Sequence, residues 1–324
     1  MLSLGMIEPL VSKYRPQLLS HYYLPSDIVE VFETVSAMDA LNVLIIADTG
    51  CGKTALTKTL VKLYYNSSSP PLKENIMFIT SLQEQGISFY RNEVRTFCQT
   101  PSTLPGKKKM LIIDDLDTVN DQSQQVFRNC IDKFSHNVQF ISTCTNVQKI
   151  IESLQSRTTI IKIPRVTRSE LMHFCNRLCE KEKLLVTKGA REFIVSVCNY
   201  SLRTLINYLE KFRLIDQKID LKLAQEVCTN INFDKLSLYT DLCFQKNLLS
   251  SIEILNESVQ AGFSVMDILD SYFLFVKSTN TLTEAQKYTI IPILCKYITI
   301  FHNIHEDDLE LVFFTSELQE ALTK

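Results

Sequence analysis

A glycine-containing turn followed by Lys53 and Thr54 is the part of this sequence best suited to binding a phosphate group. Five apolar or small residues precede the turn, which contains Gly50 and Gly52, and a helix-like run follows the threonine. Glycines let backbone N–H groups surround a polyphosphate, the lysine contacts the β- and γ-phosphates, and the threonine hydroxyl ligates Mg²⁺. The pattern G-x-x-x-x-G-K-[ST] is met except at Ala47, where a glycine is expected. The segment therefore predicts a nucleoside triphosphate site.

An acidic cluster at the end of a second apolar run could provide the metal and water chemistry of such a site. Asp114, Asp115 and Asp117 follow the apolar run 110–113. Ligands of parallel sheets bind at the carboxyl ends of strands, so we expect Asp114 to hold Mg²⁺ with Thr54, mostly through water. Asp115 is then the candidate for polarising the attacking water. Alone, the cluster would indicate a solvated turn after a strand; together with the phosphate loop it favours nucleotide hydrolysis.

The composition is typical of a folded protein with more than one domain. The chain has 324 residues, of which 45% are hydrophobic and 22% charged, and its formal net charge is −2. This length exceeds one ordinary core, and the hydrophobic content excludes a disordered chain. No apolar run has the length of a membrane span, and the first residues lack a signal-peptide pattern, so we expect no membrane partner. Ten cysteines without C-x-x-C pairs predict free thiols in an intracellular, reducing compartment.

Two kinds of pattern divide the chain near residue 165. Before it, short apolar strands alternate with helical periodicity, which favours a parallel sheet covered on both faces. The expected strands are 42–47, 76–80, 110–114, 138–144 and 159–163, and the expected helices are 54–65, 87–98, 121–134 and 147–154. After it, only helical periodicity remains, over 168–183, 187–199, 202–213, 220–229 and most of the chain from 234 onward. The predicted fold class is an α/β phosphate-loop core with a five-stranded parallel sheet, followed by helices.

Five further motifs occur in chain order between residues 9 and 213. They are Val-Ser-Lys-Tyr-Arg-Pro at 11–16, Asp-Asp-Leu-Asp at 114–117, Gln-Gln-Val-Phe-Arg at 124–128, the stretch 144–157 ending in Gln-Ser-Arg, and Leu-Arg-Thr-Leu-Ile-Asn at 202–207. With the phosphate loop, they resemble V-E-K-Y-R-P, D-E-A-D, Q-Q-A-L-R-R, K-I-I-E-P-I-Q-S-R and M-R-R-A-L-N of the replication factor C small subunits. These are clamp-loader proteins of the AAA+ ATPase family. The resemblance implies an AAA+ core over 1–165, a small helical lid domain over 166–231 and an all-α collar domain over 232–324.

The resemblance also implies which residues bind ATP. Tyr14, Arg15 and Pro16 would lie against the adenine, and Arg203 would reach the phosphates from the lid. The residues that would surround the phosphates are Asp48, Thr49, Gly50, Cys51, Gly52, Lys53 and Thr54. Ala47 and Asp48 stand where the family usually has glycine and proline.

Catalytic roles follow from the same resemblance. Asp115 stands where the family has a water-activating glutamate, and its side chain is one methylene shorter, so hydrolysis is a separate question from ATP binding. The polar sensor of the γ-phosphate falls at Thr145 or at the adjacent Asn146. Arg157 would act as an arginine finger in the site of the adjacent subunit, and Arg203 as a sensor arginine in its own site.

The cofactors implied by the resemblance are ATP and Mg²⁺. The implied partners are other clamp-loader subunits in a hetero-pentamer, a sliding clamp, and primer–template DNA held through its phosphates without sequence specificity. Arg128 would face a neighbour's nucleotide, the helix over 87–98 would approach DNA, and Phe97–Leu104 would face the clamp. The nucleus or a viral replication site is the expected location, and the departures from the family motifs suggest a divergent, viral member.

Two alternatives remain open. Ala47, Asp115 and the presence of Asn129 where the family has a second arginine would also fit a nucleotide-binding but hydrolysis-weak structural arm of the loader. Another AAA+ ATPase of DNA replication or recombination, such as an initiator or a branch-migration motor, would share the core. The Lys-Tyr-Arg-Pro and Gln-Ser-Arg-Thr motifs argue against that second alternative.

Overall fold

The computed structural model describes residues 8–66, 73–80, 86–215, 217–228, 231–279, 281–303 and 307–322. Its contacts group into two compact units, and we describe each by itself. The first unit is Met1–Leu184 with Tyr200–Asp216, and the second is Leu185–Asn199 with Gln217–Lys324. The division into three domains, with boundaries after residues 165 and 231, stays a prediction.

The first unit contains a parallel sheet of five strands in the order β2-β3-β4-β1-β5. The strands are β1 (Val43–Ile46), β2 (Ile76–Ile79), β3 (Lys109–Ile113), β4 (Val138–Cys144) and β5 (Thr159–Lys162). The predicted strands and their parallel arrangement are confirmed, and no strand end differs by more than one residue. The strands could be predicted because a sheet covered on both faces is built from continuous apolar runs.

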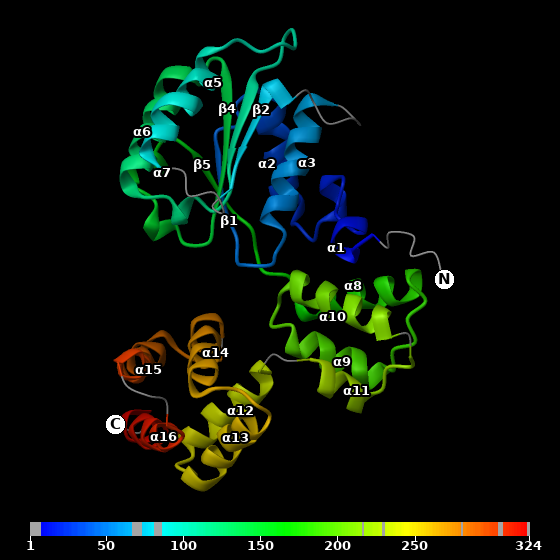
Figure 1. The fold of residues 1–324 in the computed structure, drawn as a ribbon, viewed down its shortest axis with the longest axis vertical. Coiled ribbons are helices and arrows are strands. Elements are labelled where there is room, and N and C mark those ends of the chain that lie inside the picture. The colour runs from blue at the N-terminus through cyan, green and yellow to red at the C-terminus, as the bar shows by residue number, and fades with distance from the viewer. Residues whose placement is uncertain are drawn as a thin grey trace. The chain divides into compact units, whose positions relative to one another are not determined.

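Helices cover both faces of this sheet (Figure 1). The helical elements of the first unit are α1 (Leu10–Lys13), η1 (Leu19–His21), α2 (Ser26–Ala37), α3 (Lys53–Tyr65), η2 (Lys73–Asn75), α4 (Ile87–Phe89), the π-helical turn η3 (Tyr90–Val94), α5 (Arg95–Gln99), η4 (Leu116–Thr118), α6 (Asp121–Phe134), η5 (Val147–Lys149), α7 (Glu152–Gln155), α8 (Arg168–Lys181) and α10 (Leu202–Ile215). Side chains alternate along a strand. Val43 and Ile45 therefore pack with α2 and α3, whereas Leu44 packs with η3 and α6.

The single helix predicted over 147–154 is wrong. The structure has the short turn η5 and the one-turn helix α7, with Ile150 and Ile151 extended between them. The buried side chain of Gln124 explains the break, because it donates to the carbonyl of Lys149 (3.0 Å) and accepts from the N–H of Ile151 (3.0 Å). These bonds replace the ones that a continuous helix would make.

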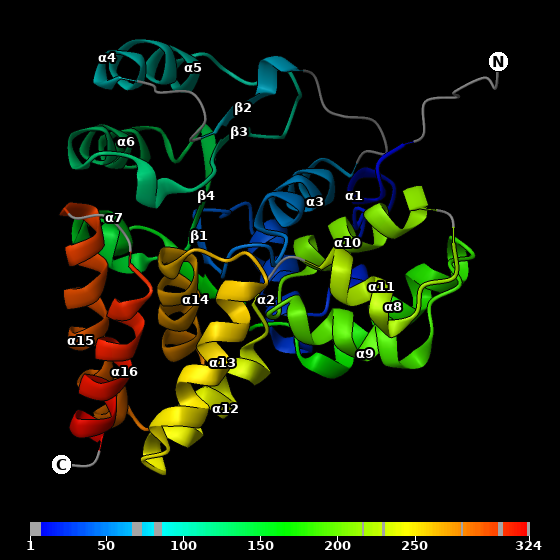
Figure 2. The same ribbon diagram turned by 60° about the horizontal axis from the view of Figure 1, so that its bottom comes forward.

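The second unit consists of helices in its described residues (Figure 2). They are α9 (Lys188–Val197), α11 (Leu221–Val227), α12 (Phe233–Phe244), α13 (Leu248–Gln260), α14 (Val265–Ser278), α15 (Glu284–Asn303) and α16 (Leu309–Leu322). The predicted helical region after residue 165 is thereby confirmed in both units. In the described part of the chain, no single helix combines the length and apolarity needed to cross a membrane; α13 and α14 reach them only as a pair bent by 119°.

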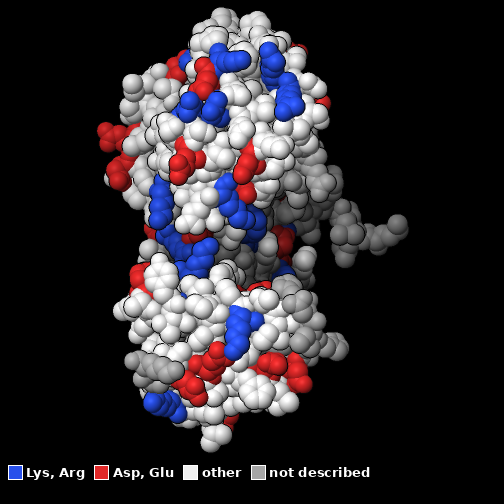
Figure 3. Space-filling view, turned by 90° about the vertical axis from the view of Figure 1, so that its left-hand side faces the viewer, with Lys and Arg blue, Asp and Glu red and all other residues white. Residues whose placement is uncertain are grey.

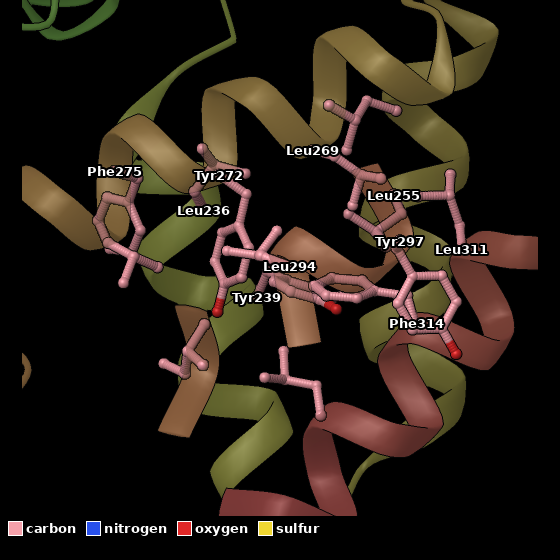
Figure 4. Close-up of a cluster of buried hydrophobic side chains, with 14 of the residues drawn as sticks. Leu236, Tyr239, Leu255, Leu269, Tyr272, Phe275, Leu294, Tyr297, Leu311 and Phe314 are labelled. Carbon is pink, nitrogen blue, oxygen red and sulfur yellow. The ribbon is translucent and has the colours of Figure 1, made fainter. Parts of the chain in front are cut away.

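Aromatic side chains fill the core between α12 and α16 (Figure 4). Tyr239 and Tyr272 meet edge to face at 5.3 Å, and Phe314 lies 6.0 Å from Tyr272. Each buried tyrosine hydroxyl has a partner: Tyr239 is 3.0 Å from Thr315 Oγ1, and Tyr272 is 3.1 Å from Thr240 Oγ1. Burial of aromatic area therefore holds these helices together without leaving these polar atoms unpaired.

All ten cysteines are free thiols. Eight are buried, Cys51 is half-buried in the phosphate loop, and Cys295 is exposed on α15. The free thiols agree with the prediction from sequence.

Candidate nucleotide-binding site

The loop between β1 and α3 needs its glycines for conformational reasons. Gly50 and Gly52 have φ angles of +78° and +93°, in the left-handed region that favours glycine. At Gly50 a side chain is also excluded by space, because a Cβ atom would lie 2.2 Å from Ser201 Oγ. The N–H of Arg203 donates to the carbonyl of Gly50 (3.3 Å). The loop thus curls at the start of α3 and lies against the start of α10.

Lys53 is the first residue of α3 and lies almost wholly inside this loop. Its Nζ donates to the carbonyls of Ala47 (3.1 Å) and Asp48 (3.4 Å), and its side chain is 8% exposed. The same ammonium is 4.0 Å from Asp115 Oδ1. A buried cation at a helix N-terminus, beside backbone N–H groups, is suited to a polyphosphate.

Thr54 and Asp114 meet where β3 ends, as the sequence predicts for a Mg²⁺ site. Thr54 Oγ1 donates to Asp114 Oδ2 (2.5 Å), and Thr143 Oγ1 donates to Asp114 Oδ1 (2.6 Å). Mg²⁺ takes hydroxyl, carboxylate and phosphate oxygens with several waters, so this pair fits that ion without a larger cage of protein ligands. Sequence reasoning missed Thr143, whose only signal is a hydroxyl within a fully buried strand.

Asp115 lies beside Asp114 in a turn with a left-handed backbone. Its φ is +53°, which is uncommon for a residue with a side chain, and its N–H donates to Thr143 Oγ1 (3.0 Å). Burial and then the negative charge of Asp114 raise the pKa of Asp115 above its usual value, although Lys53 opposes the change. A carboxylate with a raised pKa near a phosphate loop is suited to accept a proton from water.

Asp117 organises the segment after β4 that contains the two candidate sensor residues. Its Oδ2 accepts from Thr145 Oγ1 (2.5 Å), from the N–H of Thr145 (3.2 Å) and from the N–H of Asn146 (3.1 Å). Burial would raise the pKa of Asp117, but these hydrogen bonds outweigh burial and lower it. Asn146 Oδ1 accepts from the N–H of Gln148 (3.0 Å). Neither candidate lines the cavity described next, so the choice between them stays open.

A cavity of about 280 Å³ in the first unit brings most of the predicted binding residues together. Those that line it are Tyr14, Arg15, Pro16, Gly50, Cys51, Gly52, Lys53, Thr54 and Arg203, whereas Asp48 and Thr49 belong to the same loop without lining it. Apolar side chains that sequence reasoning missed also line the cavity, among them Tyr22, Phe174 and Ile206. These residues belong to no motif, because many apolar side chains can form the wall of a ligand pocket. The mixture of apolar walls and a phosphate loop fits a nucleotide.

Two arginines lie apart from this cavity, on α6 and after α7. Arg157 Nε donates to Asp132 Oδ1 (2.5 Å) and its Nη1 to the carbonyl of Ser153 (2.7 Å); the side chain is 35% exposed. Arg128 Nε is 3.8 Å from Asp132 Oδ2. Neither arginine lines the cavity. Asp132 therefore pairs with two arginines that do not line the cavity.

Asp48 is an acid within a phosphate loop, and it has a cationic partner. Arg165, which follows β5, donates from Nε to Asp48 Oδ2. A carboxylate near bound phosphates is repulsive unless a cation offsets it. The sequence showed the departure at Asp48 but not this partner.

Together, the fold and the site define a phosphate-loop nucleotide-binding protein of the doubly wound α/β class. Residues 43–165 match the sequence model of the "ATPase family associated with various cellular activities (AAA)". Over 288 residues the chain is 26% identical to the replication factor C small subunit of Methanococcus maripaludis, covering 88% of this chain and 90% of that protein. It is 23% identical to a putative replication factor C small subunit of Acanthamoeba polyphaga mimivirus, covering 88% of each.

Among solved structures, the chain is similar in fold to the RuvB Holliday junction branch migration motor of Thermotoga maritima. The TM-score is 0.53 at 14% identity, and the match covers 75% of this chain and 85% of that one. At this identity the likeness concerns the fold alone. The resemblance to replication factor C small subunits, predicted from the motifs, is confirmed.

Proposed function

We propose that this chain is an ATP-binding subunit of a clamp loader, which helps to open a sliding clamp and load it onto primer–template DNA during replication. The observation that carries the proposal is a division within the chain. Most of the phosphate loop, Thr54 and Arg203 line one cavity, and Asp114 is hydrogen-bonded to Thr54, whereas Arg157 of the Gln-Ser-Arg motif does not line it. A site that depends on an arginine from a neighbour fits a ring of subunits.

Each residue has a distinct task in this proposal. Lys53 and the loop N–H groups would bind the β- and γ-phosphates, and Thr54 with Asp114 would hold Mg²⁺, whose charge offsets that of the phosphates. Asp115 accepts the proton of the attacking water. Arg203, at the start of α10, contacts the γ-phosphate from its own chain. Thr145 or Asn146 reports whether that phosphate is present.

The ring then acts as a switch. Arg157 and Arg128 would reach the nucleotide of an adjacent subunit in a hetero-pentamer, and this contact is satisfied only in one arrangement of the ring. That arrangement holds the clamp, near Phe97–Leu104, and DNA, near α4 and α5. On the face drawn in Figure 3, Lys and Arg side chains form several groups with acidic side chains among them. The proposed DNA contacts are to phosphates and need no sequence readout. The setting would be a reducing one, either a nucleus or a viral replication site.

A structural arm that binds ATP without turning it over is the second candidate. The short Asp115 side chain, its left-handed backbone and its nearness to Lys53 favour this reading, because the carboxylate points at the loop cation. The similarity to RuvB in fold alone gives a branch-migration motor less support than a loader.

ATP turnover of the chain assembled with its loader partners tests the proposal. Turnover should rise when a sliding clamp and primed DNA are added, and Asp115→Asn should abolish the rise while ATP binding persists. Stimulation that is unchanged in Asp115→Asn would assign this chain to the structural arm. If a sliding clamp and primed DNA do not raise the turnover of the unsubstituted complex, clamp loading is contradicted.

A further inference from the structure

A nearly buried carboxylate at the end of α8 has three partners. Glu182 is 8% exposed and follows the last residue of α8. Its Oε1 accepts from Lys13 Nζ (2.6 Å) and from Tyr14 Oη (2.5 Å), and its Oε2 is 3.5 Å from Arg213 Nη1. The N-terminal residues and α10 therefore meet at one carboxylate.

The network continues along α10 and returns to the N-terminal segment. Arg213 Nη2 donates to Glu210 Oε1 (2.6 Å) and to the carbonyl of Glu8 (3.3 Å). Glu210 Oε2 in turn accepts from the N–H of Leu10 (2.5 Å). Two cations and two carboxylates thus balance in charge, and they bind the segment to α10 by backbone as well as side-chain atoms.

The two elements joined in this way form two walls of the nucleotide cavity. The N-terminal segment contributes Tyr14 and Arg15 to the lining, and α10 contributes Arg203 and Ile206. Burial and the hydrogen bond to Glu182 raise the pKa of Tyr14 to about 12, so the phenol stays a donor at neutral pH. Removing charges from water costs energy that their attraction recovers only with good geometry, so such a network specifies position more than it stabilises.

We propose that Glu182 is a positioning residue that fastens the segment 10–16 to the last turns of α10 and so holds the adenine-binding wall in place. This inference rests on the proposed nucleotide binding. It extends that function because a residue outside the cavity would determine the affinity for the base, while the phosphate loop determines the affinity for the phosphates. The phosphate loop meets α10 at the opposite end of that helix, where the N–H of Arg203 donates to the carbonyl of Gly50 (3.3 Å).

Glu182→Gln tests the inference, since glutamine keeps the size and an acceptor for Tyr14 but loses both ion pairs. Affinities for Mg²⁺-ATP and for Mg²⁺-tripolyphosphate, which lacks a base, are measured by calorimetry on the full chain. We expect ATP affinity to fall about tenfold, as for the loss of charge-assisted hydrogen bonds, and tripolyphosphate affinity to stay within about twofold. Tyr14→Phe, which keeps the ring but loses the hydroxyl, should change the two affinities in the same selective way.

Two control variants separate this inference from the function on which it rests. Glu180→Gln, exposed in the last turn of α8, should change neither affinity. Lys53→Ala should reduce both affinities. If the unsubstituted chain binds neither ligand, the result contradicts the proposed nucleotide site and not the role of Glu182.

Equal losses for ATP and tripolyphosphate in Glu182→Gln, or no loss for either, would overturn the role of Glu182. If that variant does not fold, Tyr14→Phe decides alone: selective loss of ATP supports the positioning role, and unchanged ATP affinity refutes it.

Discussion

The strand ends around the phosphate loop and the helical core between α12 and α16 are held together by different kinds of interaction. At the strand ends, individual polar atoms have individual partners, as when Asp114 uses one oxygen for Thr54 and the other for Thr143. In the helical core, buried apolar side chains such as Leu294 and Phe314 share contacts with many neighbours (Figure 4). Moving one atom by an ångström breaks a hydrogen bond, whereas a packed core accepts other side chains of similar volume.

This difference explains where the recognisable motifs of the chain lie. Bonds such as those of Lys53 and Asp114 require particular residue types, so motifs persist around them. The helices from α12 onward require only an apolar stripe at the right spacing. The motifs shared with replication factor C small subunits accordingly lie within residues 9–213, although the overall similarity covers 88% of the chain.

The largest expected effect comes from removing the loop cation. Lys53→Ala should lower ATP affinity about 100-fold, because a buried ammonium that binds phosphate oxygens is lost. The free energy of unfolding of the α12–α16 core should not change, and this would sharpen the contrast between the two regions. Calorimetry with ATP measures the affinity, and Lys58→Ala, exposed on the same helix, serves as the control. If Lys53→Ala still bound ATP tightly, this would contradict the assignment of residues 47–54 as a phosphate-binding loop.

A substitution in the helical core should lower stability and leave ATP affinity unchanged, the opposite of the result for Lys53→Ala. Phe314 is 1% exposed and Phe313, its neighbour on α16, is 59% exposed. Phe314→Ala should destabilise the second unit by about 3–5 kcal/mol and leave ATP affinity unchanged, because a large buried side chain leaves a cavity. Denaturant unfolding followed by circular dichroism measures the loss. An equal loss in Phe313→Ala would show that burial does not account for it.

The arginine after α7 should affect turnover without affecting binding. In the assembled loader, Arg157→Ala should lower hydrolysis at the adjacent site about tenfold or more, because transition-state charge loses a cation. ATP affinity of this chain should stay within about twofold, since Arg157 does not line its cavity. Lys133→Ala, exposed on α6, is the matched control. A drop confined to this chain's own ATP affinity would refute a role in the neighbouring site.

Acid should inhibit turnover before it weakens ATP binding. The pKa of Asp115 is raised by burial and by Asp114, so on acidification this carboxylate takes up a proton at a higher pH than an ordinary aspartate does. Protonated Asp115 cannot accept a proton from water, and turnover should therefore rise with pH and level off above the raised pKa. Turnover and ATP affinity measured together between about pH 4.5 and 8 test this order. Parallel loss of both would point to unfolding or to another group.

The smallest expected effect concerns the acid within the loop. The Arg165 and Asp48 side chains are 38% and 45% exposed, so their interaction is screened and weak. Arg165→Ala should lower ATP affinity about two- to fivefold, because Asp48 loses the partner that offsets its repulsion of phosphate. Asp48→Ala combined with Arg165→Ala should restore it, which a double-mutant cycle would measure. A double variant as weak as Arg165→Ala would mean that Arg165 acts on phosphate directly.

The strands and most helices could be predicted from apolar periodicity, as could the glycines and charged residues of the site. The break at Ile150–Ile151 could not, because it depends on the side chain of Gln124, distant in sequence. The same holds for Thr143 and Glu182, common residue types whose partners lie 29 and 168 residues away. Local pattern shows which residues can do chemistry, whereas the residues that hold them in place are defined by contacts that form on folding.

The uneven exposure of the cysteines makes the two regions separately visible to a chemical label. Cys51 lies in the phosphate loop and Cys295 on α15, while the other eight thiols are buried. Because burial of Cys51 raises its pKa, its alkylation should be slow at neutral pH and faster in mild alkali. We expect bound nucleotide to slow the labelling of Cys51 and leave Cys295 unchanged. One mass spectrum of the labelled chain would then report the occupancy of the loop against an internal standard within the same molecule.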